Sequence, residues 1–185
     1  MKNYIDSLVR YYSNPIKLEN AVDLILDTIK KNKNIWLIGN GGSASTAEHF
    51  EIDLMYIKTK MDLGLIRSTA LTSNSSVTTA IANDLGYRYI FSAQLERKAA
   101  EGDLCILISA SGNSENLIEA VKVCRLKKVK TLALLGFNGG ELLTLVDLFL
   151  HIKTEIGTYG VVEDIHLSIC HQISGLLLEK LKSIP

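Results

Sequence analysis

Proline is nearly absent from this chain of 185 residues, which contains only Pro15 and Pro185. No proline-rich linker therefore divides the chain, and it contains no internal repeat and no low-complexity segment. A chain of this length can bury an ample core as one domain. We therefore predict a single domain over residues 1–185.

Cysteine is also scarce. The chain has three cysteines, Cys105, Cys124 and Cys170, and no Cys-x-x-Cys motif. An odd count without that motif argues against a disulfide framework. Because each cysteine lies within an apolar pattern, we expect reduced thiols in the core.

An excess of charge of one sign is missing as well, since 20 basic residues balance 20 acidic ones. A nucleic-acid-binding domain usually carries a basic excess. The apolar runs are far shorter than the roughly 20 residues that a membrane-spanning helix needs. The charged N-terminal segment also lacks the apolar region of a signal peptide. We therefore expect a cytoplasmic protein that binds neither nucleic acid nor membrane.

Apolar runs alternate with amphipathic segments along the chain. The apolar runs predict five strands, at 35–38, within 65–71, and at 104–108, 131–135 and 146–152, with the last at an edge. Helices are predicted at 4–12, 17–30, 77–81, 87–99, 117–127 and 161–181, and one more after the first strand. This alternation indicates an α/β fold, in which helices cover both faces of a mostly parallel five-stranded sheet.

The first predicted strand is followed by Gly39-Asn40-Gly41-Gly42-Ser43. Glycines allow positive φ and a close approach of the backbone to a ligand. Ser45 and Glu48 have the spacing of a capping box, which predicts a helix start at this point. Exposed N–H groups and the helix dipole make such a turn an anion site, although glycines there can also serve packing alone. The spacing is neither that of a P-loop nor that of a dinucleotide fingerprint.

The third predicted strand has a similar sequel, Ser109-Ala110-Ser111-Gly112-Asn113-Ser114, followed by a helix. Hydroxyl and amide groups here surround the same kind of helix start. In parallel sheets, ligands bind beyond the carboxyl ends of the strands. Two such turns together predict a site for a phosphorylated small molecule.

His49 and Asp53 follow on the helix that the first turn opens. They are four residues apart, so they share one face of that helix. An imidazole and a carboxylate near an anion site could hold a metal or transfer protons. The alternative is a solvated helix face. We expect His166 on the surface or at an interface, and Tyr87 in a packing role.

Three motifs identify a family resemblance: GNGGS followed after five residues by HF, then NDLGYRYIF, then ISASGNSEN. In this order they resemble the SIS (sugar isomerase) domain, and more closely the phosphoheptose isomerases. That family interconverts sedoheptulose 7-phosphate and a manno-heptose 7-phosphate, and feeds heptose synthesis for lipopolysaccharide or capsule. The resemblance covers nearly the whole chain. It implies a flavodoxin-like SIS domain in a homo-oligomer, with a tetramer as the family expectation, and residues 1–31 at a subunit interface.

The resemblance also implies roles for individual residues. The family isomerises aldoses and ketoses through an enediol, which assigns Asp53 as the base and His171 as the acid. One zinc ion would be held by His49, Asp53, Glu163 and His171. The phosphosugar would contact the turns and neighbouring positions, namely Asn40, Gly41, Gly42, Ser43, Asn83, Asp84, Ser109, Ala110, Ser111, Ser114 and Glu163.

The chain departs from the family pattern at four positions. Asp53 stands where the family has Glu, which withdraws the carboxylate by roughly 1.5 Å. Glu163 replaces Gln, Ala110 replaces Thr, and Ile57 replaces an Arg. Such changes leave two alternatives: an isomerase acting on another sugar phosphate, and a non-catalytic oligomeric scaffold. A sugar-phosphate sensor is less consistent with the sequence, because these sensors usually carry a DNA-binding domain.

The spacing of the last two implied ligands adds a geometric expectation. Glu163 and His171 are eight residues apart on one predicted helix, about 12 Å along its axis. They also point roughly 80° apart around it. We therefore predict a site at a subunit interface, with at least one residue of the last helix supplied by a neighbouring subunit.

Overall fold

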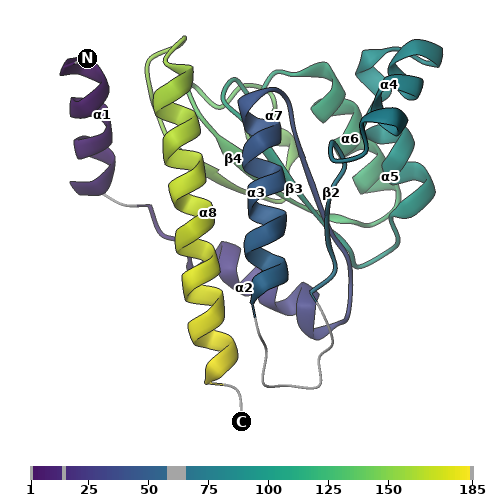
Figure 1. Cartoon of the computed structure of the whole chain (residues 1–185), viewed down its shortest axis with the longest axis horizontal. Coiled ribbons are helices and arrows are strands. Elements are labelled where there is room, and N and C mark those ends of the chain that lie inside the picture. The colour runs from purple at the N-terminus through teal and green to yellow at the C-terminus, as the bar shows by residue number, and fades with distance from the viewer. Residues whose placement is uncertain (1, 14–15, 58–65, 184–185) are drawn as a thin grey trace.

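The computed structural model describes residues 2–13, 16–57 and 66–183. Its centre is a five-stranded sheet with the strand order β2-β1-β3-β4-β5, in which every pairing is parallel (Figure 1). This confirms the predicted α/β architecture and the edge position of the last strand. The strands are β1 Ile35–Gly39, β2 Ser68–Ala70, β3 Leu104–Ser109, β4 Lys130–Leu135 and β5 Leu148–His151.

Helices cover both faces of this sheet. On one face α2 and α8 pack together with α3, while α5, α6 and α7 pack on the other (Figure 1). The short helix α1 lies against α8. The helices are α1 Lys2–Ser13, α2 Glu19–Lys30, α3 Gly42–Tyr56, α4 Ser75–Asp84, the 3-10 helix η1 Tyr87–Tyr89, α5 Ser92–Lys98, α6 Glu115–Leu126, α7 Leu142–Leu145 and α8 Tyr159–Lys182.

Strand β3 shows why its sequence is apolar throughout. Leu104, Ile106 and Ile108 belong to the core on the α2–α3–α8 side. Cys105 and Leu107 belong to the core on the α5–α6 side. Since side chains alternate along a strand, helices on both faces require apolar residues at every position. All three cysteines are buried free thiols, as the sequence predicted.

A buried carboxylate fastens the start of β1 to the start of β3. Asp103 is fully buried. Its carboxylate accepts hydrogen bonds from the backbone N–H of Asn34 at 2.9 Å, from the indole N–H of Trp36 at 2.9 Å and from the backbone N–H of Ala100 at 3.0 Å. These hydrogen bonds offset the cost of removing the carboxyl group from water.

Several predicted boundaries differ from the structure. The helix predicted at 87–99 is two elements, because η1 and α5 are separate. Helix α4 is longer than predicted, and Asn74 caps it by accepting a hydrogen bond from the N–H of Val77 at 3.1 Å. Helix α7 was not predicted. In the strand predicted at 65–71, Leu65 lies outside the described residues.

The predicted capping box at Ser45 and Glu48 is wrong. Helix α3 begins three residues earlier, at Gly42, and its N-cap is Gly41 with φ of 54°. Glu48 instead accepts a hydrogen bond from the hydroxyl of Thr72 at 2.8 Å. The glycine turn itself therefore ends the strand and starts the helix, and no serine cap is needed.

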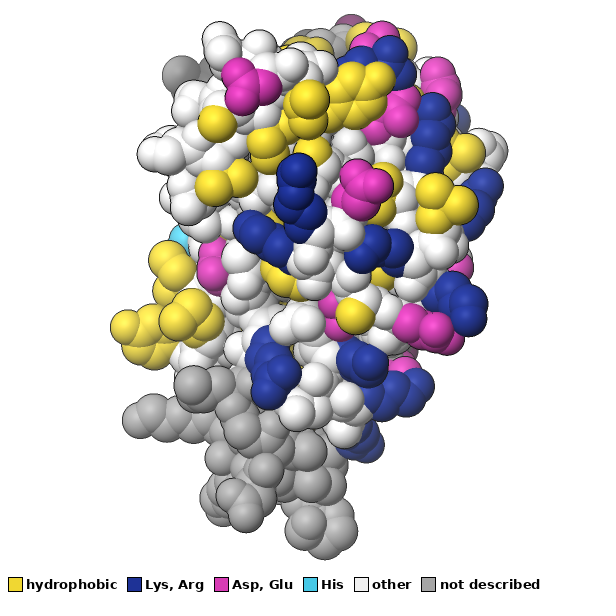
Figure 2. Space-filling view, turned by 90° about the vertical axis from the view of Figure 1, so that its right-hand side faces the viewer, with side chains coloured by type: hydrophobic (Ala, Val, Ile, Leu, Met, Phe, Trp, Pro, Cys, Tyr) yellow, Lys and Arg dark blue, Asp and Glu magenta, His cyan; other side chains and the backbone are white. Residues whose placement is uncertain are grey.

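The surface carries charges of both signs close together. Figure 2 shows Lys and Arg interspersed with Asp and Glu on the face that bears α4, α5 and α6. Among the described residues, no helix is both long and apolar enough to cross a membrane.

His166 is a further correction, because it is fully buried rather than at the surface. Neither of its ring nitrogens has a hydrogen-bond partner within normal limits among the described residues. Burial lowers the pKa of His166 from 6.5 to about 4, and the nearby backbone of Leu135 opposes this shift only in part. The imidazole is therefore neutral in the folded protein at pH 7.

This buried imidazole makes folding sensitive to acid. The unfolded chain takes up the proton near pH 6.5, whereas the folded one takes it up only near pH 4. Stability should therefore fall between these two pH values, by about 3 kcal/mol from this group alone. In urea unfolding, the wild-type protein should show this extra loss of stability, and His166→Gln should not. Equal loss in both proteins between pH 6.5 and 4 would contradict the assignment.

Candidate functional site

Two neighbouring strands bring the polar turns together. β1 and β3 pair in parallel, with Gly39 opposite Ile108 at their carboxyl ends. The chain moves from β1 to β2 on one side and then returns to β3 on the other, so the strand order reverses between β1 and β3. This switch point is where doubly wound sheets bind ligands.

The first turn packs tightly against its surroundings. The N–H of Ser43 donates to the carbonyl of Asn40 at 3.0 Å, which closes the first turn of α3. At Gly42 the place of a side chain is taken by Glu163, since an added Cβ would lie 2.3 Å from that carboxyl group. The glycine thus lets the N-terminal end of α8 approach the turn.

The second turn is stabilised by its own hydroxyl and amide groups. The hydroxyl of Ser109 accepts a hydrogen bond from the N–H of Gly112 at 3.0 Å, and that of Ser111 accepts one from the N–H of Asn113 at 3.3 Å. The side-chain oxygen of Asn113 in turn accepts from the N–H of Glu141 at 2.9 Å. These bonds fix the shape of the loop before any ligand is bound.

A pocket of about 300 Å³ lies between the two turns. Its lining includes every predicted substrate-contacting residue except Asn83 and Asp84. Those two are exposed at the end of α4, where the amide of Asn83 donates to Asp84 at 2.8 Å. The lining residues are Asn40, Gly41, Gly42, Ser43, Ile108, Ser109, Ala110, Ser111, Ser114, Tyr159 and Glu163.

Tyr159 lines this pocket although the sequence did not single it out. It is the first residue of α8, and its ring meets that of Phe137 edge to face at 5.0 Å between centroids. Phe137 follows β4, so this contact joins the start of α8 to the carboxyl edge of the sheet. The sequence signal that could have indicated Tyr159 was its position, because the last helix had to begin near the carboxyl ends of the strands.

A second group of polar side chains lies along α3 and α8. The Nε2 atoms of His49 and His171 are 3.0 Å apart. The carboxylate of Asp53 lies 3.6 Å from the Nε2 of His49 and 3.8 Å from that of His171. Both imidazoles remain about half exposed, with 47% and 52% of their side-chain surface accessible.

These three residues fit a metal ion. Four ligands at the usual Zn–N and Zn–O distances lie roughly 3.3 Å from one another in a tetrahedron, close to the separations above. Two ring nitrogens that face each other need either a shared proton or a common cation between them. In addition, the buried Oδ2 of Asp53 has no hydrogen-bond partner among the described residues. The donor set of two nitrogens and a carboxylate oxygen suits zinc.

The thiol of Cys170 adjoins this cluster but differs in state. Burial, and then the negative charge of Asp53, raise the pKa of the Cys170 thiol. Among the described residues, the group whose candidate ligand atoms all lie within 4.8 Å of one another consists of His49, Asp53 and His171, without Cys170.

Glu163, the fourth implied metal ligand, does not join this cluster within one chain. Its carboxyl lies against Gly42, whereas His171 lies farther along α8 with His49 and Asp53. Figure 1 shows α3 and α8 side by side and running in the same direction, which explains the separation. The expectation that a neighbouring subunit completes the site stays a prediction.

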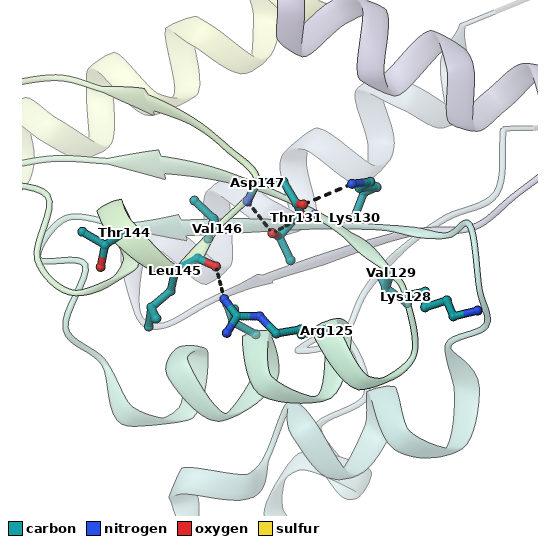
Figure 3. Close-up of a pocket in the computed structure, with 10 residues that line it drawn as sticks. Arg125, Lys128, Val129, Lys130, Thr131, Thr144, Leu145, Val146 and Asp147 are labelled. Atoms are coloured by element: carbon teal, nitrogen blue, oxygen red, sulfur yellow. Dashed lines mark hydrogen bonds and ion pairs between the residues drawn. The ribbon is translucent and has the colours of Figure 1, made fainter.

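A different pocket of about 350 Å³ lies at the other end of the strands, near the amino ends of β4 and β5 (Figure 3). Arg125 donates to the carbonyl of Leu145 at 3.2 Å, and Lys130 pairs with Asp147 at 3.2 Å. None of the predicted site residues lines this pocket. The candidate functional site is therefore the one at the switch point of the sheet.

Comparison with known proteins agrees with the fold. Residues 3–136 match the model of the SIS domain family. The chain is 35% identical to a phosphoheptose isomerase of Campylobacter concisus over 94% of this chain and 92% of that one. It is 38% identical to that of Aliarcobacter butzleri, over 86% and 83%. The chain belongs to the phosphoheptose isomerase family of SIS-domain proteins.

The solved structure of the family member from Neisseria gonorrhoeae has a TM-score of 0.85 with this chain. The two are 28% identical, and the match covers 95% of this chain and 93% of that one. Family members are isomerases, so the chain is an enzyme of this class. Ile57, which stands where the resemblance implies an Arg, is partly buried and packs against the core on the α2–α3–α8 side.

Gly39 offers a direct test of the tight turn. An added Cβ there would lie 2.6 Å from the backbone oxygen of Ser43, so the turn itself would have to move. Gly39→Ala should lower the free energy of unfolding by about 1–3 kcal/mol, measured with urea. Phosphate binding at the turn should weaken with it.

Gly175 supplies the matched control for this substitution. It lies within α8, and an added Cβ would meet nothing within 4 Å. Gly175→Ala should therefore stabilise the protein, by up to about 1 kcal/mol. If Gly39→Ala proves as harmless as Gly175→Ala, the turn is not under the constraint described here.

Proposed function

We propose that the protein is a metal-dependent phosphosugar isomerase that converts sedoheptulose 7-phosphate to D-glycero-D-manno-heptose 7-phosphate. The observation that carries the proposal is that two turns suited to an anion, at the starts of α3 and α6, lie on the same protein as a His-Asp-His cluster formed by α3 and α8. The names of the 35–38% identical relatives support the substrate. The product would enter heptose synthesis for cell-surface polysaccharide.

The spacing of the two parts supports a long sugar phosphate. Gly42 and His49 are seven residues apart on α3, about 10 Å along the helix. An extended seven-carbon sugar spans roughly the same distance from its phosphate to the carbonyl end, given C–C bonds of about 1.5 Å. The phosphate would bind at Asn40–Ser43 and 109–114, which leaves the reacting carbons near the cluster.

Aldose–ketose isomerisation through an enediol requires a base and an acid. Asp53 would take the proton from the carbon next to the carbonyl, because it supplies the carboxylate of the cluster with His49 and His171. His171 would move protons between the two oxygens. The zinc ion would be held by His49, Asp53 and His171. Glu163 would join them either from a neighbouring subunit or after a side-chain movement. When bound, zinc would polarise the sugar oxygens.

We further propose a homo-oligomer, with a tetramer as the family expectation, and sites at subunit interfaces. The half-exposed histidines lie beside exposed apolar residues of α3, namely Ile52, Met55 and Tyr56. Ile52 follows His49 by three residues and so lies on the same face of α3. A second copy seated there would cover these side chains and complete the site.

Light scattering tests the assembly. The wild-type protein should be an oligomer, and Ile52→Glu should dissociate it and reduce turnover together, since a buried unpaired charge is costly. Leu126→Glu is the matched control, because Leu126 is 84% exposed on α6. That variant should keep both properties. A monomeric wild-type protein with full activity would contradict the proposal.

Turnover tests the reaction itself. Sedoheptulose 7-phosphate should convert to an aldoheptose phosphate in an NMR assay, lose conversion with a chelator and regain it with zinc. His171→Ala should bind zinc at least about tenfold more weakly in a calorimetric titration, because a ligand is lost. His151→Gln is the control, since the Nε2 of His151 lies 3.1 Å from the carbonyl oxygen of Phe137, outside the cluster.

Two negative results of the turnover experiment would lead to different conclusions. Zinc binding without turnover would indicate another sugar phosphate, which the departures at Asp53, Ala110 and Ile57 make the second candidate. If neither zinc nor sugar phosphate binds, the isomerase proposal fails and a non-catalytic oligomeric scaffold takes its place.

A further inference from the structure

The two turns of the pocket are tied together by a pair of side-chain amides. The amide N–H of Asn40 donates to the side-chain oxygen of Asn116 at 2.9 Å. The amide N–H of Asn116 donates back to the side-chain oxygen of Asn40, also at 2.9 Å. Asn116 is the second residue of α6 and is only 2% exposed. Each amide therefore satisfies the other inside the protein.

A third residue meets the same oxygen atom. The hydroxyl of Tyr87 donates to the side-chain oxygen of Asn40 at 2.9 Å. Tyr87 belongs to η1, which follows α4 and its terminal Asn83 and Asp84. Asn40 thus connects all three sequence motifs, because its partners come from NDLGYRYIF and from ISASGNSEN.

Asn40 also stabilises the first turn through its backbone. Its carbonyl accepts hydrogen bonds from the N–H groups of Ser43 at 3.0 Å and Ala44 at 3.3 Å, so its backbone fixes the start of α3. Asn40 lines the pocket, whereas neither Asn116 nor Tyr87 does. The side chains of these two residues therefore contact a residue that lines the pocket, Asn40, without lining it themselves.

We propose that Asn116 and Tyr87 are positioning residues, which hold Asn40 so that the glycine turn is aimed at the phosphate group of the substrate. Asn116 contributes more, because it makes two hydrogen bonds from a buried position. Tyr87 makes one, and through it couples the 83–89 segment to the pocket. The proposal rests on the proposed function for its kinetic readout.

Steady-state kinetics with sedoheptulose 7-phosphate gives the first test. Loss of uniform substrate binding raises KM and leaves kcat nearly unchanged. Asn116→Ala should raise KM about tenfold, with kcat within about threefold of wild type. Tyr87→Phe should raise KM less, by about threefold. Tyr89→Phe is the matched control, since Tyr89 lies in the same 3-10 helix and makes no hydroxyl hydrogen bond to Asn40.

A double-mutant cycle separates positioning from a general loss of structure. In an Asn40→Ala background, Asn116→Ala and Tyr87→Phe should add little to KM, because the residue through which they act is gone. Gln94→Ala controls for the loss of a buried amide, since Gln94 is 2% exposed and bonds to the backbone of Leu71 and Ile90. It should lower stability without raising KM. Full additivity with Asn40→Ala would overturn the proposal.

Inorganic phosphate provides a readout that does not depend on turnover. Phosphate should shift the NMR amide signals of Gly41, Gly42 and Ser43, and its Kd should rise about tenfold in Asn116→Ala but not in Gln94→Ala. If the wild-type protein shows these shifts and Asn116→Ala weakens them, but no sugar phosphate is isomerised, the proposed function fails and the positioning role stands. If phosphate leaves these amides unshifted, or if Asn116→Ala binds it as wild type does, the positioning role is wrong.

Discussion

The parallel pairing of β1 with β3 is the constraint on which the site depends. It sets Gly39 opposite Ile108 at the carboxyl edge, so the turn after each strand must open beside the other. Both strands are fully buried, which fixes their register through the packing on both faces. Asp103 strengthens the same pairing at the opposite edge, where it joins β1 to β3 through three backbone and indole donors.

The second constraint is the parallel packing of α3 against α8. The glycine at position 42 lets Glu163 approach the start of α3, which draws the starts of the two helices together. Farther along, the same packing brings His171 to His49 and Asp53. One helix pair therefore carries both the proposed anion-binding end and the proposed metal-ligating stretch. Proximity of this kind is what a phosphosugar isomerase needs, because the phosphate and the reacting carbons lie at opposite ends of the substrate.

The sequence predicted the features that depend on local pattern. Apolar runs gave the five strands, and the glycine and serine turns after Gly39 and Ile108 indicated the pocket. It missed features that depend on packing. A 3.6-residue pattern could not show that His166 turns toward the core, and the Ser45–Glu48 spacing could not show that Glu48 bonds to Thr72 instead. The amide pair of Asn40 and Asn116 spans 76 residues, and only the fold brings it together.

The most direct test of the central claim is solvent isotope incorporation. The zinc-loaded protein and sedoheptulose 7-phosphate would be incubated in D₂O and followed by NMR. An enediol formed by proton abstraction should place deuterium on the carbon next to the carbonyl, and Asp53→Asn should abolish both the label and the isomerisation. Isomerisation without any deuterium uptake, or with uptake undiminished in Asp53→Asn, would contradict the account.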